Sequence, residues 1–231
     1  MRSPSASFFV ACVLMTAAAY PSGEQAVPKW SLSKAVEILN SSAWARHETF
    51  TKVIGGVGSG VSGEKEIFNT FYVRFLSARP IREAFARIQQ IQYGYDRLGS
   101  EEKQRFDAAI QPGLRLDVER WIVVAVGFRS NDPNEESTVR RFFQKETAET
   151  LKNKAFLSSD QFPQVALAAY FPPREEGVGA KFIFPRAING VPIVSKGQKV
   201  VFELLEVPGA NPSLRASFST KEMIVNGELL F

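Results

Sequence analysis

Apolar residues recur at helical spacing near the start of the chain. Within residues 30–44 the stripe has the i, i+3, i+4, i+7 pattern of an amphipathic helix and consists of Leu32, Ala35, Val36 and Leu39. Ser31 is placed to cap this helix, Trp30 to staple its first turn, and Asn40 to end it. The pattern therefore predicts a short N-terminal helix.

A second helix is predicted between residues 77 and 95. Ser77 is its expected cap and Pro80 lies in its first turn. Its apolar face consists of Ile81, Phe85, Ile88 and Tyr95. A shorter helix should follow Gly99, with Glu101 and Glu102 at its positive end and a stop at Pro112-Gly113.

Two strands and a third long helix are predicted around these segments. Residues 67–76 are rich in aromatic and β-branched side chains, and residues 121–128 form an almost unbroken apolar run. An apolar run of this kind indicates a strand buried on both faces. Asp132 and Pro133 then begin a predicted helix whose inner stripe is Val139, Phe143, Thr147 and Leu151, with Glu135 completing a signal like a capping box.

The chain changes character after Gln164, where short apolar runs alternate with Pro and Gly. Five such segments are predicted strands, and the last of them is a hairpin around Asn226-Gly227, the strongest turn signal in the chain. The order is strand, two helices, strand, helix and then about five strands. This order predicts one α+β domain with a largely antiparallel sheet, covering helices in the first two-thirds and a strand-rich C-terminal third.

The first nineteen residues have the character of a secretory signal peptide. An apolar run from Phe8 to Ala19 follows a start that carries one Arg and no acid, and it is too short to span a bilayer. It ends in three alanines, which suit cleavage near Ala19-Tyr20. We therefore expect residues 1–19 to be removed and the rest to be a soluble, exported protein, periplasmic or extracellular, with no transmembrane segment.

Composition narrows the possible functions. The 231 residues are 45% hydrophobic, include 19 Phe, and carry 28 basic and 24 acidic residues, for a net charge of +4. Both signs are mixed along the chain without a basic block, which argues against nucleic-acid binding. Signal cleavage would remove the single cysteine, Cys12, so the mature chain would form no disulfide, thiolate nucleophile or cysteine metal site.

The glycine run raises the question of a nucleotide site. Gly58, Gly60 and Gly63 match G-x-G-x-x-G, but such a fingerprint needs a buried strand before it and a helix after it. Here a short polar segment precedes the run and a predicted strand follows it, so we expect no nucleotide and no cofactor. The run is interpreted as a Gly/Ser-rich linker, residues 53–65, between an N-terminal helical segment, 20–52, and a main domain, 66–231.

Candidate catalytic residues are few. Any Ser-His-Asp triad or histidine metal site would need the one histidine, His47, whose neighbour Glu48 could orient it. The denser acidic groups, Asp132-Glu135-Glu136 and Glu175-Glu176, are explained by a helix cap and a turn, so no metal site is expected. A glycoside hydrolase needs only two carboxylates without a local motif, and its candidates are Asp117, Glu119, Glu203 and Glu206. Aromatic side chains that could stack on sugars are Trp44, Tyr93, Tyr95 and Tyr170.

Several segments resemble an uncharacterised family of exported bacterial proteins. They are "WSLSKAVEILNSSAWA", "VRFLSARPIREAFARI", "GAKFIFPRAINGVPIV" and the terminal "MIVNGELLF". The resemblance covers nearly the whole mature chain, and it implies a variable segment at the glycine run. It implies no activity and no catalytic residue.

These observations favour a non-catalytic module that binds another protein or an envelope glycan. The candidate binding surface is a row of arginines: Arg74, Arg79, Arg82 and Arg87. The alternative for this row is a solvated helix face, on which Arg79, Glu83 and Arg87 pair at i, i+4 spacing. The competing function is a hydrolase that uses paired carboxylates.

Overall fold

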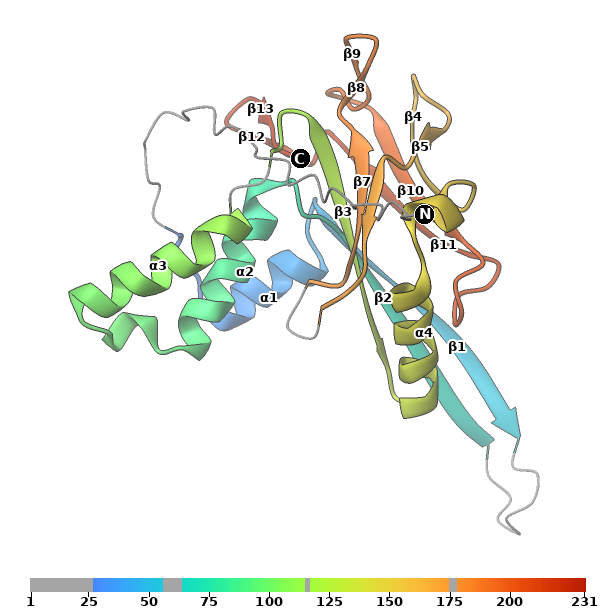
Figure 1. Ribbon diagram of the computed structural model, residues 1–231, viewed down its shortest axis with the longest axis horizontal. Coiled ribbons are helices and arrows are strands. Elements are labelled where there is room, and N and C mark those ends of the chain that lie inside the picture. The colour runs from blue at the N-terminus through green and yellow to red at the C-terminus, as the bar shows by residue number, and fades with distance from the viewer. Residues whose placement is uncertain (1–26, 56–63, 115–116, 175–177) are drawn as a thin grey trace, which may run out of the picture.

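A computed structural model describes residues 27–55, 64–114, 117–174 and 178–231. The predicted signal peptide and the three glycines of the run lie outside these residues. Three helices gather on one side of the molecule, while the strands and a fourth long helix form the other (Figure 1). No helix in the described part is long and apolar enough to cross a membrane.

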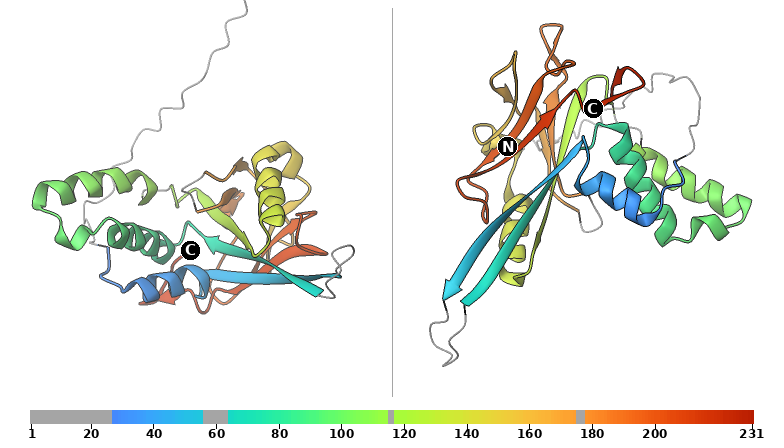
Figure 2. Two further views of the ribbon diagram at one scale, coloured as in Figure 1. Left: turned by 90° about the horizontal axis from the view of Figure 1, so that it is seen from below. Right: turned by 180° about the vertical axis from the view of Figure 1, so that it is seen from behind.

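The larger sheet has five antiparallel strands in the order β1-β2-β3-β7-β6. Its strands are β1 (Ala45–Gly55), β2 (Glu64–Phe75), β3 (Trp121–Ser130), β6 (Ala169–Phe171) and β7 (Ala180–Pro185). The long strands β1 and β2 form a hairpin that projects from the body of the molecule (Figure 2).

The second sheet has four antiparallel strands in the order β11-β10-β4-β5. Its strands are β4 (Ala155–Ser159), β5 (Val165–Ala166), β10 (Lys199–Leu205) and β11 (Ser213–Ser219). Two small hairpins complete the described strands: β8 (Ala187–Ile188) with β9 (Val191–Pro192), and β12 (Ile224–Val225) with β13 (Glu228–Leu229).

The helices fall into two groups. The first comprises α1 (Leu32–Asn40), α2 (Arg79–Gln92), the 3₁₀ turn η1 (Tyr95–Arg97) and α3 (Ser100–Leu114). The second comprises α4 (Pro133–Lys145) and the single turn α5 (Ala148–Leu151). The α4 helix lies along the β1–β2 hairpin (Figure 1), where Lys52 and Lys65 pair with Glu135 and Asp132.

The core lies between the two sheets and is rich in aromatic rings. The ring centroids of Phe182 and Phe202 lie 5.2 Å apart, and those of Phe75 and Phe218 lie 4.8 Å apart. In each pair one ring comes from each sheet, so these contacts join the two sheets. Phe143 of α4 meets Phe182 on the same face. We call this the inner face of the five-stranded sheet, and the opposite one its outer face.

Strand β3 confirms the expectation of a strand covered on both sides. All five residues from Ile122 to Val126 are buried. The second sheet and α4 cover the inner face, whereas α1 and α2 approach the outer face beside β2. The α+β class, the antiparallel sheets and the concentration of strands toward the C-terminus are likewise confirmed.

The predicted linker is corrected where the structure describes it. Val53–Gly55 and Glu64-Lys65 belong to paired strands rather than to a tether, and residues 45–55 form an edge strand of the larger sheet. Its pattern of buried positions explains why the sequence did not reveal it: only Ala45 is fully buried along eleven residues. A strand with little burial leaves no alternating apolar signal.

Helix ends follow the predicted signals in some places and depart from them in others. Ser31 caps α1 through the Lys34 amide, and Asp132 caps α4 through two amides, as expected. Ala78 precedes α2 without a side-chain cap, because the Ser77 hydroxyl accepts from the Val123 amide of β3 instead. Helix α4 ends at Lys145, and Thr147 caps α5 rather than lining an inner stripe.

The C-terminal hairpin has the backbone that its turn signal predicts. Asn226 and Gly227 have φ angles of 50° and 80° and connect β12 to β13. Two consecutive positive φ angles characterise the type I′ turn, for which Asn-Gly is the preferred pair. This part of the fold therefore follows directly from two residues.

Candidate functional site

Positive charge collects on the outer face of the five-stranded sheet. The strand register places Arg74 of β2 opposite Ala125 of β3, and Ala125 opposite Lys181 of β7. Residues in register point to the same face, and the neighbours of these three point to the inner face. Arg74 and Lys181 therefore share the outer face, separated by one small residue. We call Arg74, Lys181, Tyr72 and His47 the outer-face cluster.

Arg74 is held against the C-terminal end of α1. Its Nε donates to the Leu39 carbonyl at 2.6 Å, and its Nη2 donates to Asn40 Oδ1 at 2.8 Å. The guanidinium also lies 4.9 Å from the centre of the Tyr72 ring and 5.9 Å from that of Phe85. The negative end of the helix dipole and the two rings stabilise a cation at this position.

No carboxylate neutralises Arg74 among the residues that the structure describes. The residue is only 9% exposed, and this burial lowers its pKa to about 10. It is still a cation at neutral pH. A buried charge without a counter-ion is uncommon, because desolvation costs free energy that an opposite charge usually offsets.

One nitrogen of Arg74 stays available. Among the described residues Nη1 has no hydrogen-bond partner, whereas the N–H of Nε and one N–H of Nη2 are engaged. In the described part of the chain, the only fully buried side-chain nitrogen or oxygen without a partner is Asn69 Oδ1. Nη1 must therefore retain contact with solvent, from which a ligand could approach it.

Lys181 adds a second charge without a partner. It is partly buried, and it forms no ion pair or side-chain hydrogen bond with the described residues. Burial, followed by repulsion from Arg174, lowers its pKa. The repulsion from Arg174 shows that the surroundings of Lys181 are electropositive, which would favour a nearby anion.

His47 lies beside the cluster without a catalytic partner. Its Nδ1 is 3.1 Å from the Asn40 carbonyl, and its ring centre is 6.2 Å from that of Tyr72. Glu48, the expected orienting residue, follows it on a β-strand and so points to the opposite face. His47 therefore contributes to the edge of a polar surface rather than to a histidine–carboxylate pair.

The predicted arginine row is corrected, because its members do not share one exposed face. Arg79 pairs with Glu83 at 2.6 Å, as expected for a solvated helix face. Arg82 donates to the carbonyls of Leu76 and Ser77. Arg87 is 7% exposed and is buried between α2 and the segment before α1, and Arg74 belongs to the sheet.

The carboxylates proposed for hydrolysis contact separate neighbours. Asp117 is paired with Arg120 at 3.9 Å, Glu203 accepts from the Ser213 hydroxyl, and Glu206 is paired with Lys154 at 2.6 Å. No contact among the described residues joins two of the four candidates. Nor does any group of three His, Cys, Asp or Glu side chains in that part of the chain have the arrangement of a metal site.

Most of the candidate sugar-stacking aromatics are engaged in structural contacts. Trp44 donates to the Leu230 carbonyl, Tyr95 donates to Asp107, and Tyr170 is buried and donates to the Phe143 carbonyl. Tyr93 is 72% exposed, although its ring meets that of Phe106 with the centroids 5.5 Å apart. The four do not form a platform.

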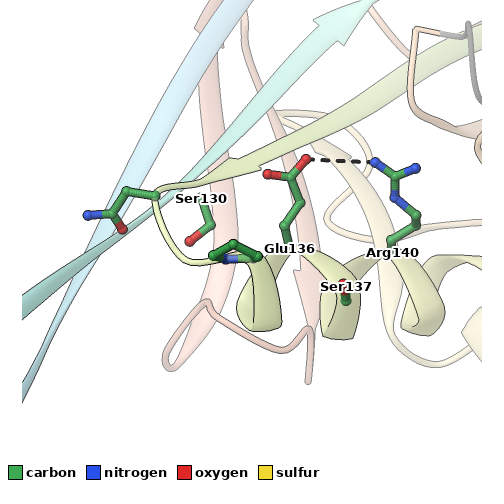
Figure 3. Close-up of a pocket in the computed structure, with 6 residues that line it drawn as sticks. Ser130, Glu136, Ser137 and Arg140 are labelled. Carbon is green, nitrogen blue, oxygen red and sulfur yellow. Dashed lines mark ion pairs between the residues drawn. The ribbon is translucent and has the colours of Figure 1, made fainter.

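Two surface hollows lie elsewhere, and each contains an ion pair. One, of about 270 Å³, lies at the start of α4, where Glu136 accepts from Arg129 and lies 3.7 Å from Arg140 (Figure 3). The other, of about 480 Å³, lies over β10 and β11 and contains the pair Arg46–Glu222. Neither has the unneutralised buried charge of Arg74.

Sequence reasoning named Arg74 but not Lys181, Tyr72 or Ala125. Only the register of β2, β3 and β7 brings these residues onto one face. No family model, curated protein or solved structure matches this chain. The chemistry of the outer-face cluster is therefore the basis for a functional proposal.

Proposed function

We propose that the chain is a non-catalytic binding module that holds an acidic envelope glycan on the outer face of its larger sheet. The observation that carries this proposal is the buried guanidinium of Arg74, which no carboxylate of the described residues neutralises. Lys181 adds a second cation on the same face, and it too has no ion-pair partner among the described residues. An anionic ligand would supply the missing counter-charge for both.

The energetic argument concerns burial. Arg74 has already lost most of its hydration on folding, so an incoming anion displaces little further water from it. Charge-assisted hydrogen bonds are roughly twice as strong as neutral ones, and they strengthen where the local dielectric is low. A recessed, prepositioned guanidinium is therefore suited to binding an anion.

The surroundings favour a carbohydrate acid over a broad acidic protein surface. Arg74 is recessed, so a single projecting carboxylate reaches it more easily than a flat surface does. The Tyr72 ring lies beside the guanidinium, and aromatic side chains next to polar groups are typical of small-ligand sites. A sugar that carries a carboxylate offers both a projecting anion and an apolar ring face.

Binding to polygalacturonate tests this proposal, with neutral dextran and poly-glutamate as comparison ligands. We expect the wild type to bind polygalacturonate, and Lys181→Glu to weaken that binding about tenfold or more, because charge-assisted contacts contribute about 1.5–3 kcal/mol and 1.4 kcal/mol is tenfold. Lys152→Glu makes the same charge change at an exposed position and should bind nearly as the wild type does. Isothermal titration calorimetry measures all three proteins.

Three results would contradict the proposal. Equal binding of dextran and polygalacturonate would remove the role of charge. A preference for poly-glutamate would assign the surface to an acidic protein instead. If Lys152→Glu weakened binding as much as Lys181→Glu, the net charge of the chain would matter rather than this face.

We propose further that the protein is exported, as the apolar run from Phe8 to Ala19 and the resemblance to exported proteins suggest. Replacing alternate residues of that run with Ser and Asn should leave an uncleaved protein in the cytoplasm of a bacterial host, because the targeting machinery recognises an uninterrupted apolar segment. Cell fractionation with mass determination of the product measures this. A cleaved variant outside the inner membrane would show that another segment directs export.

A further inference from the structure

We propose that Nη1 of Arg74 is the donor that anchors a carboxylate of the ligand, and that Gly127 keeps the approach to this nitrogen open. This inference rests on the proposed binding function and specifies its contact. Gly127 lies on β3 opposite Tyr72, two residues from Ala125, so it belongs to the outer face. Its backbone φ is not among the positive ones, so no turn requires glycine there.

The reason for glycine at this position is space. A Cβ built on Gly127 would lie 3.1 Å from Arg74 Nη1, 3.8 Å from the Val178 carbonyl oxygen and 3.9 Å from Tyr72 Cβ. The first distance is shorter than an ordinary van der Waals contact. A methyl group would therefore press on the one guanidinium nitrogen that donates to no hydrogen-bonding group of the described residues.

The occupied nitrogens restrict the form of the contact. Arginine often binds a carboxylate with two parallel N–H bonds, but here Nε and Nη2 donate to Leu39 and Asn40. The Nε–Nη2 edge is therefore closed to a ligand carboxylate, and the N–H groups left open to it are the two of Nη1 and the second one of Nη2. A carboxylate oxygen bound here can also accept from another group, and Lys181 is the other cation on this face that no described residue neutralises.

The substitution Gly127→Ala tests the inference without changing any charge. It adds one methyl group beside Nη1 and leaves Arg74, Lys181 and Tyr72 in place. Gly55→Ala is the matched control, since Gly55 is also a strand glycine and an added Cβ there meets nothing within 4 Å. Both variants should fold, which thermal unfolding by circular dichroism verifies.

The direct readout is the side-chain nitrogen signal of Arg74 in ¹⁵N-arginine-labelled protein during a titration with sodium acetate, at constant ionic strength against sodium chloride. The Arg74→Lys spectrum assigns the signal by its loss. We expect acetate to shift the Arg74 signal to a plateau in the wild type and in Gly55→Ala. In Gly127→Ala the dissociation constant from this titration should be at least tenfold higher. The signal of exposed Arg79 should stay unchanged.

The same proteins are then titrated with polygalacturonate. Tight binding that Gly127→Ala leaves intact would overturn the Arg74 anchor while the glycan function stands. A saturating shift of Arg74 by acetate, without polygalacturonate binding, would overturn the glycan as ligand while the carboxylate anchor stands. Equal shifts of Arg74 and Arg79, or none at Arg74, would show that no carboxylate site exists at Nη1.

Discussion

Val124→Asp is expected to destabilise the protein by about 3–5 kcal/mol, the cost of an uncompensated charge in a protein interior. Val124 is 0% exposed and lies in register with Phe75 and Phe182 on the inner face. No Lys or Arg lies within three residues of it along β3. Domains are stable by about 5–15 kcal/mol in total, so this single carboxylate removes a large share of the stability.

Chemical denaturation in urea, followed by circular dichroism, measures the effect. Arg129→Ala is the control on the same strand, because the Arg129 side chain is 73% exposed and pairs only with a surface acid. It should change the free energy of unfolding by no more than about 1 kcal/mol. A Val124→Asp protein that unfolds at the wild-type urea concentration would contradict the assignment of β3 as the covered central strand.

Arg87→Asp is expected to be the second most damaging change, at about 2–4 kcal/mol. The sequence suggested a solvated position for Arg87, where its replacement would change the free energy of unfolding little. The structure places Arg87 at 7% exposure, where Nε donates to the Trp30 carbonyl at 2.8 Å and Nη2 pairs with Asp96 at 3.1 Å. Aspartate would leave that carbonyl unpaired and bring a second negative charge toward Asp96.

The pH dependence of the same variant gives an independent check. The hydrogen bond from Arg87 is the largest cause that lowers the pKa of Asp96 in the folded protein. A depressed carboxyl pKa stabilises the fold above the ordinary value of about 3.9, and this contribution is lost as pH falls through the folded value. The gap in melting temperature between wild type and Arg87→Asp should therefore narrow on acidification below about pH 4.

Arg79→Asp is the matched control for Arg87→Asp. Arg79 begins α2, where an acidic residue is compatible with the helix dipole, and its side chain is 49% exposed, although its partner Glu83 is 15% exposed. Its replacement should cost no more than about 1 kcal/mol. If Arg79→Asp proved more damaging than Arg87→Asp, the burial of Arg87 between α2 and the Trp30 segment would be wrong.

The elements that the sequence predicted well are those with a strong local signal. The Ser31 cap, the Asp132-Pro133 start of α4 and the Asn226-Gly227 turn each depend on a few adjacent residues. The apolar run of β3 likewise indicated a strand that is buried on both faces. These features follow from hydrogen bonding and hydrophobicity within a short window, so the sequence suffices to predict them.

The features that the sequence predicted wrongly depend on contacts between distant parts of the chain. Strand β1 was missed because its partner β2, and not its own burial, makes it a strand. Arg79 and Arg87 look equivalent on a helix, yet one meets solvent and the other meets the Trp30 carbonyl. A helical pattern shows which residues share a face, but not which segment from elsewhere in the chain covers it.

Some features of the protein and its candidate site likewise follow from local sequence, and others depend on the tertiary structure. The sequence by itself determined the α+β class and the central strand, because propensity and hydrophobic period act locally. Only the tertiary structure decided that Arg74, Gly127 and Lys181 meet on one face, because strand register joins positions more than fifty residues apart along the chain. That register, and the burial it imposes on Arg74, creates an unneutralised charge that no local pattern encodes.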